Sequence, residues 1–152
     1  MGHIPSTTEL NIIYWNIGSM KTKEKRSYIQ ALLANIVPTP DIICLQETHL
    51  KESDNFKMPG YVTYISHDNK PTSHGLLTLV SQTIHAARIQ SPVPGLYSEI
   101  QSLQINLPHK SIQIHNLYKN HNDKLQVFSL FDQITTSSDS CIIMGDFNAH
   151  HP

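Results

Sequence analysis

Short apolar runs, many of them rich in β-branched residues, recur along the chain and are separated by polar or turn-favouring residues. Runs of this length, bounded by turn signals, are typical of buried or half-buried strands. They predict strands at Leu10 to Asn16, Asp41 to Gln46, Val62 to Ser66, Leu76 to Ser81, Ala86 to Gln90, Glu99 to Asn106, Ser111 to Leu117, and a last one that starts at Cys141 and runs into Gly145-Asp146-Phe147-Asn148.

Two stretches instead repeat apolar residues at helical spacing, from about Thr22 to Val37 and from about Asp123 to Thr135. Pro38 and Pro40 end the first helix, and Asp123 is a plausible N-cap of the second. The residues expected to face the core are Tyr28, Ile29, Leu32, Leu33 and Ile36 in the first helix and Val127, Leu130, Phe131 and Ile134 in the second.

The first helix joins two predicted strands into a βαβ unit, which normally implies parallel strands that are buried on both faces. The middle of the chain is instead rich in hairpins, with Asp68 to Gly75 as one connecting loop. This mixture predicts an α/β fold of mixed α+β character, in which two sheets pack as a sandwich with helices outside. Without an internal repeat or a convincing linker, we expect one domain from residue 10 onward, after a leader from Met1 to Glu9.

Composition adds little about function. The chain has 152 residues, of which 39% are hydrophobic and 15% charged, which suits one globular domain. Its net charge is -1, so binding to nucleic acid would depend on local groups and a metal ion. Cys44 and Cys141 lie in apolar runs and are expected to be reduced packing residues. The absence of an N-terminal apolar segment and of a long apolar run argues against secretion and a membrane span, and favours cytoplasm or nucleus.

Three predicted strands finish in residues that carry chemistry: Asn16, Glu47, and Asp146 with Asn148. While the chain stays extended, Asp146 and Asn148 point to the same side and Phe147 points into the core. A carboxylate can orient a proton, and a neutral amide can hold a phosphate oxygen without repulsion. The same residue types also favour ordinary turns, so each motif alone is also consistent with a strand end.

In this order, Trp15-Asn16, Leu45-Gln46-Glu47-Thr48, the isolated Tyr118 and Gly145-Asp146-Phe147-Asn148 resemble the endonuclease/exonuclease/phosphatase superfamily. Gln46 to Leu50 and Gly145 to His151 are similar to the apurinic-endonuclease-like domain of non-LTR retrotransposons. The resemblance implies a four-layer αββα, DNase I-like fold. It also implies an endonuclease that nicks target DNA for a retroelement, with a reverse transcriptase domain in the full-length element.

The resemblance implies a role for each matching residue. Mg²⁺, or Mn²⁺, would be bound by Glu47 with support from Asn16. Tyr118 would donate a hydrogen bond to the phosphate, Asp146 would orient the attacking water, and Asn148 would hold a phosphate oxygen. Hydrolysis of a phosphodiester needs such a metal, a positioned water and a proton donor for the leaving oxygen.

Other candidates have structural alternatives. The cationic cluster near the start of the first helix could contact a phosphate backbone through Lys21 and Lys23, although such charges more often form a solvated helix face. Tyr118 could equally be a half-buried core residue whose hydroxyl is satisfied. His49, His150 and His151 could face the site, but we expect surface or turn histidines, and no spacing predicts zinc.

The departures from the family pattern concern the metal and the base. Gly18 stands where many members carry an acidic residue, His74-Gly75 replaces Gly-Gly, and Lys119-Asn120 replaces a Pro after the Tyr. The closing Ser-Asp-His segment has no counterpart before Pro152, so the resemblance implies a fold and a catalytic set that are incomplete at the C-terminus. The alternatives to an endonuclease segment are an inactive remnant of a retroelement endonuclease and another phosphoesterase of the superfamily.

Overall fold

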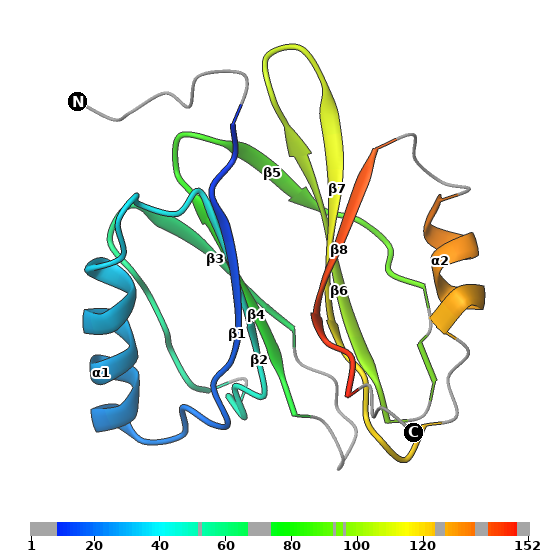
Figure 1. The fold of residues 1–152 in the computed structure, drawn as a ribbon. Helices are drawn as coiled ribbons and strands as arrows, with labels where there is room; N and C mark the ends of the chain where they lie inside the picture. The colour runs from blue at the N-terminus through cyan, green and yellow to red at the C-terminus, as the bar shows by residue number, and fades with distance from the viewer. Residues whose placement is uncertain are drawn as a thin grey trace.

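The computed structural model describes residues 9–51, 53–66, 74–92, 94–95, 97–123, 127–135 and 140–148. Two four-stranded sheets face each other, and one helix lies on the outer side of each sheet (Figure 1). The layers therefore run helix, sheet, sheet, helix. The predicted two-sheet sandwich with outer helices is confirmed.

The first sheet contains the parallel pair that the βαβ pattern predicts. Its strands, in spatial order, are β1 (Ile12–Asn16), β2 (Ile42–Gln46), β4 (Leu76–Ser81) and β3 (Tyr61–Ser66). Helix α1 (Lys23–Ala34) connects β1 to β2, which run parallel with Ile12 opposite Ile42. Strands β4 and β3 add to this pair as antiparallel neighbours.

The second sheet repeats this pattern with a different chain order. Its strands, in spatial order, are β5 (His85–Arg88), β6 (Glu99–Asn106), β7 (Ser111–Tyr118) and β8 (Cys141–Asp146). Strands β7 and β8 are parallel, and helix α2 (Val127–Thr135) lies between them in sequence. Strands β5 and β6 complete the sheet as antiparallel neighbours.

Alternation along the strands divides the core into layers. In β2, Ile42 and Cys44 face the second sheet, while Ile43 and Leu45 face α1, so this strand is buried on both faces. Leu130 and Ile134 of α2 cover the outer face of the second sheet. The two free cysteines contribute to these layers, Cys44 fully buried and Cys141 partly buried.

The apolar stripe of α1 is narrower than predicted. Ile29 and Leu33 are buried and Ile36 packs beside them, whereas Tyr28 and Leu32 are 62% and 40% exposed. The prediction that these two face the core is therefore wrong, because their row on the helix is rotated by about 100° from the row of Ile29 and Leu33 that faces the sheet. The helix begins where the pattern indicates, with Thr22 Oγ1 accepting a hydrogen bond from the Lys25 backbone N–H.

The second helix agrees with prediction where it is described. Leu130 and Ile134 are buried, and Phe131 packs edge-to-face against Phe147. The Asp123 carboxylate, expected at the helix N-cap, accepts hydrogen bonds from the backbone N–H groups of Tyr97 and Ser98. Residues 124–126 and the Val127 side chain lie outside the described residues.

Some sequence predictions fall on residues that the structure does not describe. These are Met1 to Thr8 of the expected leader, Asp68 to Ser73 of the expected loop, and His150 and His151. Among the described residues, no helix has the length and apolar character needed to cross a membrane.

Candidate active site

The predicted site residues come from the matching ends of the two parallel strand pairs. In the first pair, Asn16 ends β1 and lies opposite Gln46, the last residue of β2, which Glu47 follows. In the second pair, Tyr118 ends β7 and lies opposite Asp146, the last residue of β8. The edge strands β1 and β8 also pack against each other across the sandwich. Residues from both sheets therefore meet at one end of the fold, where the chain leaves the strands.

The side-chain amide of Asn16 connects the two carboxylates. Its Nδ2 donates to Glu47 Oε1 at 2.9 Å and to Asp146 Oδ2 at 2.7 Å. Its Oδ1 accepts from the backbone N–H of Gly18 at 3.0 Å, which keeps the amide oriented. Asp146 lies 130 residues from Asn16 in sequence, so this contact depends on the packing of the two sheets. An amide oxygen has a second lone pair, which leaves the predicted metal role of Asn16 open.

Tyr118 is almost completely buried, and its hydroxyl donates a hydrogen bond to the Glu47 carboxylate. Burial raises the pKa of Tyr118 to about 12, and the negative charge of Glu47 and this hydrogen bond add to the effect. The hydroxyl therefore stays protonated at neutral pH. Tyr118 combines the two interpretations of its sequence position, because it is a packed residue whose polar end reaches the site.

The chain leaves the extended conformation directly after Asp146. Asn148 has a φ of 42°, its backbone N–H donates to Asp146 Oδ1 at 2.9 Å, and its side-chain Nδ2 donates to the Lys119 carbonyl oxygen. The strand was predicted to stay extended through Asn148, and this is wrong, because β8 ends at Asp146. The amide nevertheless stays beside Asp146, on the loop that follows β8.

The residue before Asp146, Gly145, has no room for a side chain. A Cβ at this position would lie 1.8 Å from the carbonyl oxygen of Leu117, and φ is +146°. Strands β7 and β8 therefore approach so closely that only glycine fits. This approach places Asp146 beside Tyr118 at the end of the pair.

Two histidines join Glu47, a grouping that the sequence analysis did not predict. One ligand atom from each of Glu47, His49 and His74 lies within 4.8 Å of the others. The His74 ring lies 4.8 Å from the Tyr118 ring and 5.2 Å from the His49 ring, measured between centroids. Nδ1 of His74 is buried and has no hydrogen-bond partner among the described residues.

His49 lies in the irregular segment that follows β2 and is half-buried rather than on the surface. Burial lowers its pKa, and the positive charges of His74 and Lys21 lower it further. Lys21 is therefore near the site, at its exposed rim, whereas Lys23 is the exposed first residue of α1. Phosphate binding by the two lysines stays a prediction.

Glu99, a buried carboxylate at the start of β6, holds the segment that carries His74. It accepts hydrogen bonds from the backbone N–H of His74 at 2.8 Å and of Gly75 at 3.2 Å. Gly75 in turn packs against Thr48, because a Cβ there would lie 2.6 Å from Thr48 Oγ1. The sequence analysis did not predict Glu99, because it begins a strand in which many residues are polar and therefore does not stand out.

A layer of polar side chains lies beneath the site, between the two sheets. Gln46 Nε2 donates to Asn116 Oδ1 at 2.7 Å, and Thr78 Oγ1 donates to Gln101 Oε1 at 2.7 Å. Asn116 Nδ2 also donates to the Leu45 carbonyl oxygen. Buried polar groups of this kind are stable only with their partners in place, so they fix the register of one sheet on the other.

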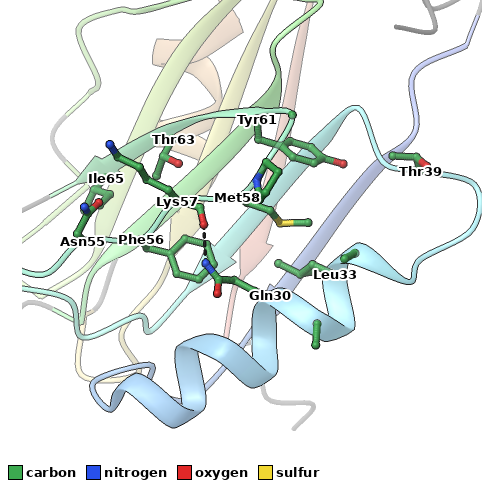
Figure 2. A pocket seen from close by; sticks show the side chains of 14 residues that line it. Gln30, Leu33, Thr39, Asn55, Phe56, Lys57, Met58, Tyr61, Thr63 and Ile65 are labelled. Carbon is green, nitrogen blue, oxygen red and sulfur yellow. Dashed lines mark hydrogen bonds between the residues drawn. The ribbon is translucent and has the colours of Figure 1, made fainter. Parts of the chain in front are cut away.

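A separate groove lies between α1 and β3 on the outer side of the first sheet (Figure 2). Leu33, Phe56 and Met58 form much of its apolar lining, and Gln30 donates a hydrogen bond to the Lys57 carbonyl oxygen. None of its lining residues is an acid or a histidine. The groove therefore lacks the groups for hydrolysis, and the strand-end cluster is the candidate active site.

Comparison with known proteins shows a family match over the region that contains the strand-end cluster. The family model described as the Endonuclease/Exonuclease/phosphatase family matches residues 13–152, which is nearly the whole chain. The match includes Asn16, Glu47, Tyr118, Asp146 and Asn148.

Solved structures of low sequence identity share the fold. The human Nocturnin catalytic domain with bound sulfate has a TM-score of 0.64 and 17% identity, covering 93% of this chain and 64% of that one. D. rerio TDP2 complexed with single strand DNA product has a TM-score of 0.62 and 16% identity, with coverages of 93% and 62%. The endonuclease domain of TRAS1, a telomere-specific non-LTR retrotransposon, has a TM-score of 0.60 and 18% identity, with coverages of 93% and 61%. The chain thus spans less than two thirds of each.

Proposed function

The chain belongs to the endonuclease/exonuclease/phosphatase family, and on this premise we propose that its strand-end cluster serves metal-dependent hydrolysis of phosphodiester bonds in DNA. The observation that carries the proposal is the amide of Asn16, which holds Glu47 of one sheet and Asp146 of the other beside each other. Two adjacent carboxylates are unfavourable without a donor or a cation between them. Such a pair is what a metal-assisted hydrolase needs.

The donor set is compatible with a divalent cation. Glu47 is half-buried and offers carboxylate lone pairs beyond those that Asn16 and Tyr118 use. Glu47, with Asn16 in support, would hold Mg²⁺ or Mn²⁺. His74, whose buried Nδ1 has no hydrogen-bond partner among the described residues, lies close to Glu47. When bound, the cation would offset the negative charge that develops on the phosphate.

The remaining groups have separate roles in the proposed reaction. Asp146, held by Asn16 and by the Asn148 N–H, would orient the attacking water. The protonated Tyr118 keeps Glu47 in place and can donate to a phosphate oxygen that displaces this hydrogen bond. Asn148 would donate to a second phosphate oxygen after releasing the Lys119 carbonyl. Lys21 and Lys23 would contact the backbone of the substrate, since cations mainly position nucleic acids.

For the substrate, we propose target DNA that is nicked on behalf of a retroelement, with reverse transcription performed by another domain. The sequences Gln46 to Leu50 and Gly145 to His151 support this, together with the fold shared with the TRAS1 endonuclease domain. DNA is also the molecule bound in the TDP2 structure. Because the chain spans less than two thirds of these structures, the activity is proposed for the protein that contains it.

A plasmid-nicking assay tests the proposal. The longest available form of the protein is incubated with supercoiled DNA and Mg²⁺, and the fraction of nicked circles is followed over time. We expect nicking that EDTA abolishes and that Glu47→Gln and Asp146→Asn each slow by about 10²-fold or more. Glu24→Gln, in the exposed first turn of α1, is the matched control and should leave the rate unchanged. Nicking that survives EDTA or Glu47→Gln would contradict the proposal.

A further inference from the structure

We propose that Glu47, His49 and His74 together form a binding site for a transition-metal ion such as Zn²⁺, with one carboxylate and two imidazole ligands. The inference deepens the proposed function by adding a transition metal to the ions that Glu47 would bind, and it rests on that function only for the catalytic use of the ion. Hard cations such as Mg²⁺ prefer oxygen ligands. A set with two ring nitrogens favours Zn²⁺, Co²⁺ and related ions instead.

The geometry of the three side chains is close to that of a bound ion. Their ligand atoms lie within 4.8 Å of one another. Tetrahedral ligands at about 2.1 Å from zinc lie about 3.4 Å apart, so inward movements of up to about 0.8 Å by each ligand atom close the set. Histidine and glutamate make movements of this size by small torsional changes.

The strongest sign of a missing ligand is the buried Nδ1 of His74. This atom is out of reach of solvent and has no hydrogen-bond partner among the described residues. Buried polar atoms without a partner are rare in native proteins, and each calls for an explanation such as an unseen ion. In the proposed site, Nδ1 is the His74 atom that binds the ion shared with Glu47 and His49, which gives this nitrogen a partner.

The surroundings restrict the three ligands in the way that metal sites require. Glu99 binds the backbone N–H groups of His74 and Gly75, and Gly75 packs against Thr48, which lies between the other two ligands. Asn16 and Tyr118 hydrogen-bond the Glu47 carboxylate and fix its orientation. Contacts of this second layer orient ligands and tune metal affinity. Glu47 and His49 both have positive φ angles, 53° and 51°, which is unusual for residues with side chains and common at functional sites.

Cobalt and zinc titrations test the inference. The wild-type protein is titrated with Co²⁺ while visible absorption is recorded, and Zn²⁺ then displaces the cobalt. We expect saturable binding of one ion, weakened at least about tenfold by His49→Ala and by His74→Ala. His109→Ala removes an exposed histidine of a turn and should leave the affinity within about twofold of wild type. Circular dichroism of each variant checks that it is folded, and His74→Gln provides a milder second variant.

Nitrogen-15 NMR of the histidine rings gives a readout that is independent of activity. On addition of Zn²⁺, the His74 Nδ1 resonance should move to the position of a metal-bound nitrogen. Zinc binding that is unaffected by both substitutions, or an unchanged His74 Nδ1 resonance at saturation, would overturn the inference. If Mg²⁺-dependent nicking requires Glu47 but neither histidine affects zinc binding, only this inference fails. If zinc binding requires the histidines and no nicking occurs, the proposed function fails and the metal site stands.

Discussion

The two sheets have the same kinds of strand pairing, in a different chain order, but contribute different chemistry. Each contains a parallel pair whose connection includes a helix, together with two antiparallel strands. The first sheet supplies Glu47, His49 and His74, which are candidate metal ligands. The second supplies Tyr118 and Asp146, which handle protons and water in the proposed reaction. The active site thus forms where two similar units meet, and neither sheet contains it alone.

Burial also differs between the two strands that lead to the carboxylates, β2 before Glu47 and β8 ending in Asp146. Strand β2 is fully buried and lies between β1 and β4, whereas β8 is an edge strand with Ile142 partly exposed. The position of Asp146 therefore depends on the pairing of β8 with β7, and the position of Glu47 does not. Changes to the β7 and β8 pair should have the largest effects, and changes around Glu47 should mainly alter metal binding.

Substitution of Gly145 should give the largest loss of stability. A Cβ at this residue would lie 1.8 Å from the Leu117 carbonyl oxygen, which is backbone and cannot rotate away. We expect Gly145→Ala to lower the free energy of unfolding by roughly 3 kcal/mol or more, from overpacking and from the positive φ. Urea denaturation measures this change in the free energy of unfolding. Gly60→Ala is the matched control, because Gly60 also has a positive φ but open space around it, and should cost only about 1 kcal/mol. Equal losses would contradict the close approach of β7 and β8.

The second prediction concerns His115, which is buried in the second sheet with Nδ1 hydrogen-bonded to Ser102 Oγ at 2.7 Å. Burial lowers its pKa to about 4. The unfolded chain therefore binds the proton more readily, so stability from the neutral ring is complete above about pH 6.5 and is lost as the pH falls toward 4. We expect a loss of up to about 3 kcal/mol across this range.

The difference in stability between the wild type and His115→Gln, measured by urea denaturation at several pH values, isolates this effect. The wild type should lose more stability than the variant between pH 6.5 and pH 4. Parallel pH profiles for the two proteins would show that His115 is not the group responsible.

Removal of the hydrogen bonds that Asn16 makes between the two sheets should cause a smaller loss of stability. Asn16→Leu removes the donor of both carboxylates at similar volume and should destabilise the protein by about 2 kcal/mol, because hydrogen bonds to charged groups are stronger than neutral ones. A double-mutant cycle with Asp146→Asn isolates the contact between sheets. Additive effects within about 0.5 kcal/mol would mean that Asn16 does not couple the two sheets.

The strand ends could be predicted from sequence because they depend on local pattern. Apolar runs identify β1, β2, β7 and β8, and parallel pairing brings their carboxyl ends to one edge, which is why Asn16, Glu47, Tyr118 and Asp146 converge as expected. The pattern could not show how far each strand continues. It therefore placed Asn148 on an extended strand, although the chain turns after Asp146.

The histidine cluster could not be predicted because it depends on contacts between distant segments. His74 lies shortly before β4, and its backbone N–H is held by Glu99 of the other sheet, a contact that exists only when the two sheets are packed. His49 alone lacks the spacing of a metal site, and its partner lies 25 residues later. For Tyr28 and Leu32 the sequence predicted a contact with the core that the structure does not contain, because helical periodicity does not show how wide a face of the helix the sheet will cover.

The smallest predicted effect tests the central claim, that Glu47 is a metal ligand at the meeting point of the two sheets. Glu47→Gln keeps the size of the side chain and removes its charge. Melting of both proteins is followed with increasing Mg²⁺ or Mn²⁺, with Glu24→Gln as the control. At a metal concentration ten times the dissociation constant, binding stabilises the wild type by about 1.4 kcal/mol. We predict that the melting midpoints of wild type and Glu24→Gln rise with metal while that of Glu47→Gln stays nearly constant. Equal rises in all three proteins would contradict the assignment of Glu47.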